Sequence, residues 1–432
     1  MSAQAVAPPW ALALARVFER AGQPLWVVGG AVRNPLMGLP ISDVDMCGPA
    51  LPREVCALCE GTQVRAVLRA AHFGTVELHV ADDQGRHMAE YTTFREDSYR
   101  CGHRPEAVRF AKDLSVDALR RDFSVNALYR RCLPEGLNPV EDPTGGLEHL
   151  RRGVLHTVTE NPDQVLKDDG LRILRAARFQ AELGLTPTEG LLDSAARHVP
   201  LLKDIAPERL HDELVKVLMA DFRYPMLARS APATQSGLDT ICGIGAWPFL
   251  FGKLGYDREA ARALAGLRLP RELPPAGARL ALLLWREDPQ EIRRALERLR
   301  FPVREQEEAQ RLAALLSKAA QEGLSPLEAL QAGSGALDFV ADALAALGRP
   351  EPRERVEALR SRLLERRAPK SLRELALGGE DARLLCQQRG LSLSWVGALL
   401  SELWRAVAEG ELENERHALL QAAGKWLGSA GE

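Results

Sequence analysis

The chain of 432 residues is too long for one hydrophobic core, and roughly 100–200 residues per domain predicts two to four domains. Hydrophobic residues make up 46% of it and charged residues 27%, as in an ordinary soluble globular protein. Its formal net charge of −3 excludes a global attraction to nucleic acid, so local basic clusters would have to hold any polyanionic partner.

The 7 cysteines are irregularly spaced, and this odd number fits a reducing compartment better than a disulfide framework. No apolar run approaches the ~18 residues of a membrane helix. The N-terminus lacks the basic segment and apolar core of a secretory signal. We therefore expect a cytoplasmic protein with no membrane partner.

Between about residues 24 and 145, short apolar runs bounded by Gly, Asp and Pro predict β-strands. The strand-like runs are residues 25–30, 75–80, 87–94 and 107–110. We expect the second and third of these runs to form a hairpin across the polar loop 81–86. A helix is predicted between the first strands and this hairpin, at residues 52–61.

From about residue 160 onward, apolar residues recur at helical spacing. The clearest predicted helices are residues 168–183, 206–219, 289–300, 304–320 and 393–410. The sequence therefore predicts an α+β protein, in which an N-terminal head with a mixed sheet and helices precedes an all-α remainder.

The segment 24–45 combines an apolar run, a glycine pair, an arginine and two alternating aspartates. In a strand, Asp43 and Asp45 would present their carboxylates on one face, where a hard cation such as Mg²⁺ relieves their repulsion. Gly29 and Gly30 would let backbone N–H groups approach phosphate oxygens, and Arg33 would add a charge-assisted contact. A solvated loop is the alternative for each motif alone, but together they predict a metal–triphosphate site.

A third acid is expected on a strand next to the aspartate pair. Glu77 and Glu90 both lie on the predicted hairpin. We prefer Glu90, with Glu77 as the alternative, and either could instead face solvent.

The segment 119–129 places polar residues in an otherwise apolar stretch. We predict a helix here, in which Asp122 and Asn126, four residues apart, share one face. They suit a ribose hydroxyl and a phosphate oxygen, with an arginine, Arg120 or Arg121, on the triphosphate. The alternative is a capping aspartate beside a basic surface. Residues 141–146 predict a Pro-Gly turn that closes the head, with a structural role for its second acid, Asp142.

In the predicted helix 168–183, Asp169 and Arg172 are three residues apart, and Arg175 and Arg178 continue the same stripe. Such a pair is commonly a surface salt bridge worth under ~1 kcal/mol. It can also read a base, because the carboxylate accepts from an amino group and the guanidinium donates to the neighbouring ring acceptor. Cytosine and adenine share that pattern, whereas uracil and guanine lack it.

These motifs, in this order, resemble the class II tRNA nucleotidyltransferases, the CCA-adding enzymes of the polymerase-β-like superfamily, which also contains the poly(A) polymerases. The likeness rests on "VGGAVRN…SDVD", "EYTTFR", "RRDFSVNAL", "DPTGG" and "DDGLRILRAARF". It continues into "SLRELALGGEDARLL…WVGALLSELWRAVAEGELENER" near the C-terminus and is weakest between about residues 215 and 360.

The resemblance implies a polymerase-β-like head at 1–147, a base-recognising neck at 148–215, a body at 216–325 and a tRNA-binding tail at 326–432. It implies Asp43 and Asp45 as ligands of catalytic Mg²⁺. The implied nucleotide-binding residues are Gly29, Gly30, Arg33, Arg121, Asp122, Asn126, Asp169, Arg172, Arg175 and Arg178.

The implied reaction extends a tRNA without a nucleic-acid template. The 3′-hydroxyl attacks the α-phosphate of CTP or ATP in line and pyrophosphate leaves, with two metal ions assisting. The implied partners are the tRNA 3′ end and its acceptor and T arms, and the sequence leaves the oligomeric state open.

The chain departs from the family at two positions of the site. Asn34 stands where the family usually has Asp, which fits a structural or phosphate-adjacent role better than metal binding. Asp168 replaces the usual Glu before the templating aspartate, and its shorter side chain would hold the helix less firmly.

Some motifs are set aside. Cys56 and Cys59 are spaced like half a zinc site, but no second pair follows. His211 and Asp212 resemble the dyad of HD phosphohydrolases, yet they lie on a helix that its apolar positions explain. The basic segments 291–300 and 360–373 are either solvated faces or phosphate contacts.

Three other functions remain as alternatives. A poly(A) polymerase shares the head motifs, but it would carry a basic segment where this chain has "HFGTVELHV". A CC-adding or A-adding enzyme adds only part of the sequence. CC-adding enzymes shorten the loop that in this chain spans 95–110 and carries Arg100, His103 and Arg104. A noncatalytic RNA-binding protein is disfavoured by the retained aspartate pair.

Overall fold

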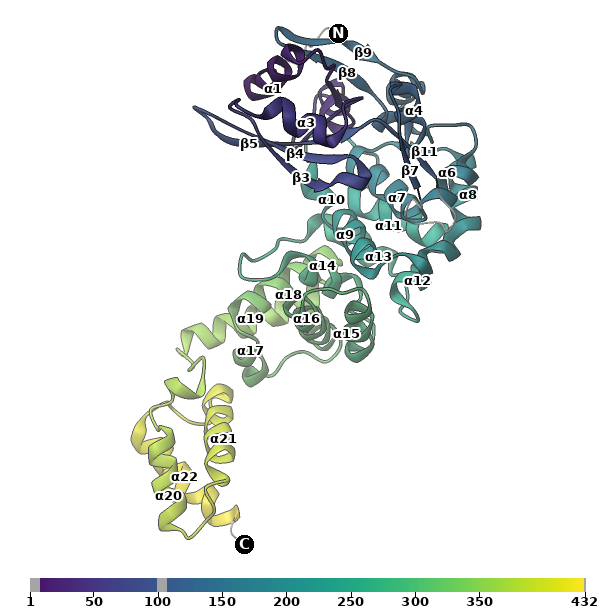
Figure 1. Cartoon of the computed structure of the whole chain (residues 1–432). Coiled ribbons are helices and arrows are strands. Elements are labelled where there is room, and N and C mark those ends of the chain that lie inside the picture. The colour runs from purple at the N-terminus through teal and green to yellow at the C-terminus, as the bar shows by residue number, and fades with distance from the viewer. Residues whose placement is uncertain (1–7, 99–106, 431–432) are drawn as a thin grey trace. The chain divides into compact units, whose positions relative to one another are not determined.

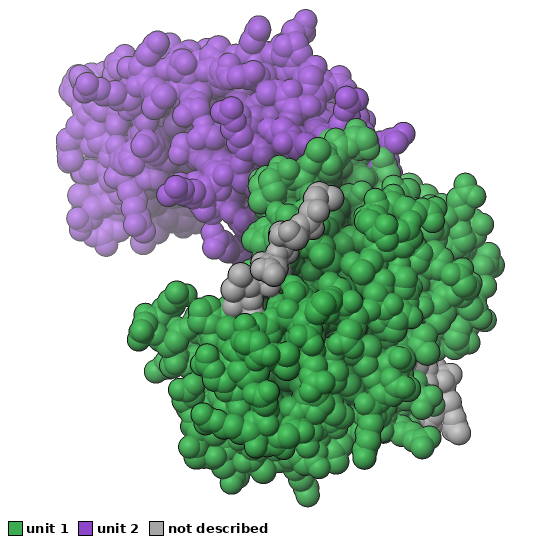
Figure 2. All heavy atoms as spheres, turned by 90° about the horizontal axis from the view of Figure 1, so that it is seen from above, with its two compact units in different colours: residues 1–252 green, residues 253–432 purple. Residues whose placement is uncertain are grey.

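The computed structural model describes residues 8–98 and 107–430, and the chain forms two compact units. Unit 1 is Met1–Gly252 and unit 2 is Lys253–Glu432 (Figure 2). Strands occur only in unit 1 among the described residues, and the rest of the chain is helical (Figure 1). The α+β class with an N-terminal head is thereby confirmed. The four-part division at 147, 215 and 325 stays a prediction.

The centre of unit 1 is a seven-stranded sheet in the order β3-β4-β5-β2-β1-β8-β9. Its strands are β1 (Trp26–Val28), β2 (Val44–Gly48), β3 (Arg65–Ala70), β4 (Thr75–Asp82), β5 (Gly85–Thr93), β8 (Tyr129–Leu133) and β9 (Gly136–Glu141). The β2–β5 pair is parallel and the other pairs are antiparallel, so the sheet is mixed. Separate two-stranded sheets are formed by β6 (Arg95–Ser98) with β7 (Ala107–Phe110) and by β10 (Val154–Leu155) with β11 (Thr186–Pro187).

One face of this sheet is covered by helices. The helices that precede or connect its strands are α1 (Pro9–Arg20), α2 (Gly30–Leu36), α3 (Pro52–Cys59) and α4 (Leu114–Leu119). Buried Phe18 of α1 lies 5.4 Å from the ring centre of Tyr91 on β5, and Val76 and Leu78 of β4 are in the same core. Because strand side chains alternate between faces, the residues between these apolar ones lie on the opposite face. There Val28, Cys47 and Tyr129 are buried against Ala118 of α4, whereas the side chains of β3, β4 and β5 on that face are partly or fully exposed.

The remainder of unit 1 is a helical layer that follows the sheet. It consists of α5 (Gly146–Arg151), α6 (Pro162–Asp168), α7 (Leu171–Leu183), α8 (Glu189–His198), α9 (Pro207–Leu218), α10 (Ala220–Arg223), α11 (Ala233–Gly243) and α12 (Trp247–Phe251). Helix α7 is buried along most of its length and packs against α9 and α11. This position brings its polar side chains next to the head.

Unit 2 is helical throughout its described residues. Its helices are α13 (Arg258–Ala263), α14 (Pro275–Leu283), α15 (Pro289–Arg298), α16 (Val303–Gln321), α17 (Pro326–Ala332), α18 (Ser334–Ala346), α19 (Pro350–Glu365), α20 (Gly379–Gln388), α21 (Trp395–Glu409) and α22 (Arg416–Ala430). Leu377, Leu399 and Leu419 belong to a core that the last three helices share. Within the described part of the chain, no helix is both long and apolar enough to cross a membrane.

The hairpin prediction is confirmed, with a tighter turn than expected. Strands β4 and β5 pair from Thr75↔Thr92 to Asp82↔Gly85, so the strands include most of the predicted loop. Asp82 Oδ1 accepts hydrogen bonds from the backbone N–H groups of Gln84 and Gly85, which stabilises the turn. The helices predicted at 52–61, 206–219, 289–300, 304–320 and 393–410 are also present, as α3, α9, α15, α16 and α21.

The prediction of a helix over 119–129 is wrong. Helix α4 ends at Leu119, a short 3₁₀ helix η2 (Ser124–Asn126) follows, and β8 then begins. Asp122 is the reason, because its Oδ1 accepts from the backbone N–H of Phe123 and from the Asn126 side chain. Such local side-chain bonds favour turns over helix.

The helix predicted over 168–183 is interrupted near its start. Helix α6 ends at Asp168, Asp169 is extended with φ −145° and ψ 107°, and α7 begins at Leu171. A Cβ on Gly170 would lie 2.8 Å from the Cβ of Leu201, so a glycine is needed for this close approach. The predicted i, i+3 helical pair of Asp169 and Arg172 is therefore corrected, because only Arg172 lies in a helix.

The predicted turn at 141–146 closes the sheet as expected. Asp142 accepts hydrogen bonds from the backbone N–H groups of Gly146 (2.8 Å) and Leu147 (2.9 Å), which confirms its structural role. Gly146 packs so closely on η2 that a Cβ would lie 2.2 Å from the Ser124 carbonyl oxygen. Gly146 therefore sets the position of η2.

We expect Gly146→Ala to destabilise unit 1 by ~1–3 kcal/mol, because η2 or α5 must shift to admit the methyl group. The measurement is the midpoint of denaturant unfolding. Gly190→Ala is the control, since nothing lies within 4 Å of a Cβ at that exposed helical position. Equal midpoints for the two variants would contradict the packing argument.

Candidate functional site

Three carboxylates lie near one another on the face of the sheet opposite Val44 and Met46. Asp45 lies on β2 with Asp43 one residue before the strand, and both side chains are exposed while Val44 and Met46 are buried. The β2–β5 register pairs Asp45 with Glu90, which puts the third carboxylate next to the first two.

Glu77, the alternative third acid, is held by other side chains. Its carboxylate is 2.8 Å from Arg69 Nε and 3.1 Å from His79 Nε2. It lies one strand further from Asp45 than Glu90 does, because β4 pairs with β5. The geometry therefore favours Glu90, although its role stays a prediction.

The site residues fit a hard divalent cation. The pKa of Asp45 is raised, mainly because the cavity walls limit its contact with water, while Arg121 lowers it and Asp43 raises it. The pKa of Glu90 is raised by its burial and then by Asp45. Among the described residues no group of three or more His, Cys, Asp or Glu side chains is placed to hold a metal ion, so the fit rests on the pair Asp43 and Asp45. An open carboxylate set of this kind suits Mg²⁺, which keeps waters and takes phosphate oxygens.

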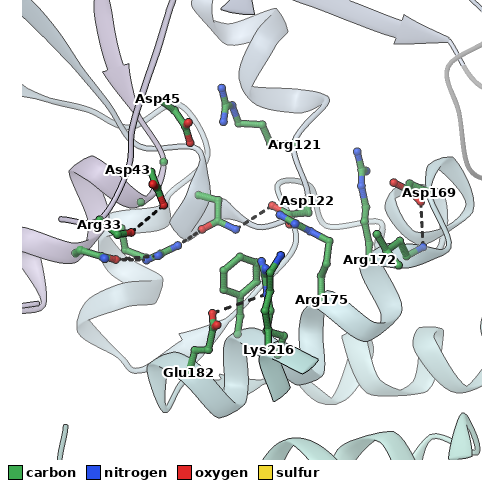
Figure 3. A pocket seen from close by; sticks show the side chains of 18 of the residues that line it. Arg33, Asp43, Asp45, Arg121, Asp122, Asp169, Arg172, Arg175, Glu182 and Lys216 are labelled. Atoms are coloured by element: carbon green, nitrogen blue, oxygen red, sulfur yellow. Dashed lines mark hydrogen bonds and ion pairs between the residues drawn. The ribbon is translucent and has the colours of Figure 1, made fainter. Parts of the chain in front are cut away.

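A cavity of about 1310 Å³ in unit 1 adjoins the aspartate pair (Figure 3). It is lined by every nucleotide-binding residue predicted from the sequence: Gly29, Gly30, Arg33, Arg121, Asp122, Asn126, Asp169, Arg172, Arg175 and Arg178. Asp43 and Asp45 also line it, whereas Glu90 is not among the lining residues. Arginines dominate its charged lining, which suits an anionic ligand.

The glycine pair lets the main chain turn tightly beside this cavity. Gly29 has φ +70°, which side chains disfavour, and a Cβ there would lie 3.6 Å from the Asn126 carbonyl oxygen and 4.0 Å from Arg121 Nη1. The turn carries the chain from β1 directly into α2, which contains Arg33.

Arg33 is buried, and two asparagines hold its guanidinium. Its Nη1 donates to Asn126 Oδ1, and its Nε and Nη2 donate to Asn34 Oδ1 at 3.2 and 2.8 Å. Burial lowers the pKa of Arg33 to about 10, so it remains charged at neutral pH. Asn34 in turn donates to the Pro40 carbonyl (3.0 Å) and to Tyr224 Oη (2.9 Å). A carboxylate at position 34 could not donate these two bonds.

Asp122 connects the head to helix α7. Its Oδ2 accepts from Arg175 Nε at 2.7 Å and lies 2.6 Å from Arg175 Nη2, while its Oδ1 accepts from Asn126. Burial by itself would raise the pKa of Asp122, but Arg175 and Asn126 hold it well below its usual range. The carboxylate therefore orients Asn126 and Arg175 at the wall of the cavity, with both of its oxygens already bonded.

Asp169 and Arg172 line the same cavity but do not pair with each other. Asp169 Oδ2 is 2.7 Å from Arg209 Nη2 of α9, and its Oδ1 accepts from the Leu171 N–H. Arg172 is buried and donates to the carbonyls of Val165 (3.0 Å) and Arg120 (2.5 Å). The neighbouring Asp168 accepts from Gln164 Nε2 at 2.7 Å.

Sequence reasoning missed a group of side chains on α7 and α9. The guanidinium carbons of Arg33, Arg175 and Arg178 lie 5.4, 5.2 and 4.3 Å from the ring centre of Phe179. Glu213 of α9 lies 3.1 Å from Arg178 Nε. The sequence does contain a pattern that indicates this group, because the charged residues Arg209, Glu213 and Lys216 are spaced to lie on one face of a helix.

Segments from both units of the chain match families of known proteins. Residues 25–156 match the family described as Poly A polymerase head domain, 184–229 the RNA and SrmB-binding site of polymerase A, and 277–423 tRNA nucleotidyltransferase domain 2. The CCA-adding enzyme of Geobacillus stearothermophilus is 32% identical over 418 residues, which cover 95% of this chain and 96% of that protein. The chain belongs to the CCA-adding enzyme family.

Other CCA-adding enzymes match over similar lengths. That of Limosilactobacillus fermentum is 32% identical over 413 residues, covering 95% of each chain. The crystal structure of the Bacillus stearothermophilus CCA-adding enzyme in complex with CTP has a TM-score of 0.75 at 28% identity and covers 98% of this chain and 99% of that chain. The Thermotoga maritima CCA-adding enzyme complexed with tRNA, at 19% identity, shares the fold with a TM-score of 0.64 over 96% of this chain and 94% of that one. The family and fold expected from the sequence are confirmed.

The Asp122 contacts predict an acid-sensitive site. A lowered carboxyl pKa stabilises the fold above the ordinary aspartate value near 3.8, and this contribution is lost as pH falls through the folded-state pKa. We expect Asp122→Asn to lower the free energy of unfolding at pH 7 by about 3 kcal/mol, the low end of the usual range for a broken buried ion pair, because Arg175 is partly exposed. The variant should also lose less stability than the wild type as the pH falls below 4.

Denaturant unfolding at several pH values tests this, with the exposed Asp193→Asn as the control. A wild-type slope below pH 4 in the Asp122 variant would show that another group governs the acid transition.

Proposed function

We propose that the protein adds C, C and A to the 3′ end of tRNA, using CTP and ATP and releasing pyrophosphate without a nucleic-acid template. The observation that carries the proposal is the position of Asp43, Asp45 and Glu90 beside an arginine-lined cavity. The end-to-end likeness to CCA-adding enzymes, one of them solved with CTP and another with tRNA, supports this substrate class.

Asp43 and Asp45 would hold Mg²⁺, with Glu90 beside them. Bound Mg²⁺ would supply the positive charge that lowers the pKa of the attacking hydroxyl and neutralises the phosphates. The use of two ions, which the family resemblance implies, is part of this proposal. Because Asp43 and Asp45 line the cavity, a metal ion that they hold would face a primer hydroxyl and an α-phosphate bound there.

The arginine group on the cavity wall would bind the triphosphate. Arg33, Arg175 and Arg178 gather around Phe179, and Arg121 is held by Asp117 and Tyr129. Because these guanidinium groups are already fixed by neighbours, little side-chain entropy is lost when phosphate oxygens bind. Asn126 would contact the ribose or a phosphate, with Asp122 fixing its orientation.

Asp169 and Arg172 would select the base. Arg172 uses two of its five N–H groups on backbone carbonyls, which fixes the guanidinium and leaves N–H groups to donate to a ring acceptor. Asp169 Oδ2 would accept the amino hydrogen of cytosine or adenine while keeping Arg209 as its neighbour. This arrangement accepts CTP and ATP and leaves unpaired groups opposite UTP and GTP.

The extent of addition stays a prediction. Arg100, His103 and Arg104, the residues by which the sequence favours complete CCA addition over CC addition, lie outside the described residues. The direct experiment is to incubate the protein with tRNA that lacks its last three nucleotides, and in parallel with tRNA that ends in CC, first with single nucleotides and then with CTP and ATP together.

Product lengths then separate the functions. Two added nucleotides with CTP and three with both support the proposal. Two with both indicate a CC-adding enzyme, one A only on a CC-ending tRNA indicates an A-adding enzyme, and long A tracts indicate a poly(A) polymerase. No extension under any condition would overturn the proposal.

We expect Asp43→Ala and Asp45→Ala each to abolish nucleotide addition while tRNA affinity stays near that of the wild type, because these carboxylates hold metal and not RNA. Addition rates and tRNA binding by filter retention are the measurements. Asp83→Ala, in the exposed β4–β5 turn, is the control. Activity within about tenfold of wild type in both variants would contradict the metal assignment.

We expect Asp169→Ala to add CTP and ATP poorly and to incorporate UTP or GTP at a measurable fraction of that rate. Without Asp169, UTP and GTP no longer leave a buried group unpaired, a penalty of roughly 1–3 kcal/mol. The preference for CTP and ATP over UTP and GTP should therefore fall by about five- to two-hundred-fold. Single-nucleotide incorporation with the four NTPs measures it.

Arg209→Ala separates base reading from helix support, because it removes the ion pair and keeps the carboxylate. This variant should retain the preference for C and A. If Asp169→Ala also retained that preference, Asp169 would have only a structural role.

A further inference from the structure

In the strand order, the strand that carries Asp45 has a different neighbour on each side. Asp45 is on β2 in the middle of the sheet, with β1 as one neighbour and β5 as the other. Gly29, Gly30 and Arg33 follow β1, so the proposed triphosphate site lies on the β1 side. In-line displacement at phosphorus requires the attacking oxygen to approach opposite the leaving pyrophosphate. The primer 3′-hydroxyl must therefore approach over β5, and its upstream nucleotides over β5, β4 or β3.

That half of the sheet carries an uncovered basic surface. On β5, Arg86 and Met88 alternate with buried Ala89 and Tyr91, so they share the face of Glu90. The register pairs Met88 with His79 on β4, and His79 with Arg65 on the edge strand β3. We call the residues Arg65, Arg69, His79, Arg86 and Met88 the outer strip (strands β3–β5 in Figure 1).

The outer strip is hollowed and positively charged. A cavity of about 570 Å³ lies among its residues, lined by Arg65, Arg69, His79 and Arg86. Among the described residues no carboxylate pairs with Arg65 or Arg86, while Arg69 shares Glu77 with His79. The nearby Asp82 is bound to the backbone of its own turn and to His87.

Its centre offers side chains suited to a nucleoside. Met88 is 52% exposed and the His79 side chain 41%, and the two lie opposite each other between the arginines. Proteins that hold single-stranded nucleic acid combine a basic groove along the backbone with side chains on which bases or sugars rest. The outer strip has both features.

We propose that the outer strip binds the phosphate backbone of the tRNA primer strand behind its 3′ end. This rests on the proposed function. Strands β2 and β3 are three strand spacings apart, or ~14 Å at ~4.8 Å each. That distance corresponds to only a few nucleotides of an RNA strand, so the contacted phosphates would lie close behind the reacting hydroxyl. The outer strip continues to the nucleotide cavity. Two residues of β3 and β4 line that cavity, namely Ala70, which follows Arg69, and Thr75.

The test is the double charge reversal Arg65→Glu/Arg86→Glu in the full chain. Loss of two exposed phosphate contacts should raise KM for tRNA lacking CCA about 5- to 25-fold and leave KM for CTP and kcat at saturating tRNA unchanged. The slope of log affinity for tRNA against log salt should become shallower by ~1.5–2, because two fewer counterions are released. The matched control is Arg16→Glu/Arg20→Glu on α1, which covers the opposite face.

Position is tested by phosphate ethylation of the tRNA. Ethylation of the phosphates a few nucleotides behind the 3′ end should weaken binding to the wild type and have little further effect on the strip variant. If the strip and α1 variants have the same tRNA affinity and salt slope, or if interference falls only at distant phosphates, the proposal is overturned.

The outcome is separable from that of the proposed function. tRNA affinity is measured by fluorescence anisotropy without nucleotides, so it is informative even for an inactive protein. A wild type that binds tRNA through the strip but adds nothing would overturn only the proposed reaction. A wild type that adds CCA with no effect of the strip variant would overturn only the strip.

Discussion

A buried carboxylate holds the catalytic half of this protein together. Asp122 lies in a turn of the head, yet its strongest contact is a two-nitrogen pair with Arg175 of α7. Through Asn126 it also fixes Arg33, which follows the first strand of the sheet. Sheet, turn and helix therefore meet at one charge. That charge is removed from water, and an unpaired buried carboxylate costs several kcal/mol. Loss of any one partner would therefore destabilise the fold.

The same contacts offset the mutual repulsion of the arginines that line the cavity. Arg33, Arg175 and Arg178 surround one phenylalanine ring closely enough to repel each other strongly. Asp122 and Glu213 compensate part of that charge, and the electron-rich face of the ring compensates a further part. The remaining positive potential is what a triphosphate with its metal would neutralise. The cavity is thus stable when empty and still attractive to a polyanion.

Local patterns predicted the parts of this site that belong to single strands and turns. The glycine pair and the alternating aspartates need only a strand end and strand alternation, and both are found there. The strands β3, β8 and β9 of the main sheet were not predicted, because charged and other polar residues interrupt the apolar pattern in each of them. The segments around Asp122 and Asp169 were predicted as helix, since spacing alone cannot show a side chain that bonds its own backbone.

Contacts between distant segments were beyond any pattern in the sequence. Asp169 meets Arg209 because α9 packs on α7, and Gly170 is required by a residue 31 positions later, Leu201. The family resemblance supplied the residues of the cavity that carry the proposed chemistry, whereas spacing arguments gave the wrong local structure around Asp122 and Asp169. Neither identified Phe179 or Glu213, whose importance appears only when three arginines are seen around one ring.

The contact between Asn34 and Tyr224 has a consequence for protein engineering. These residues are 190 positions apart, and the amide of Asn34 donates to Tyr224 and to the Pro40 carbonyl while its oxygen faces Arg33. A chimaera that takes its head from a relative with aspartate at this position would bring a carboxylate to Tyr224 in place of the amide that donates to it. Heads and helical segments of different relatives are therefore not freely interchangeable, and positions 34 and 224 should be transferred together.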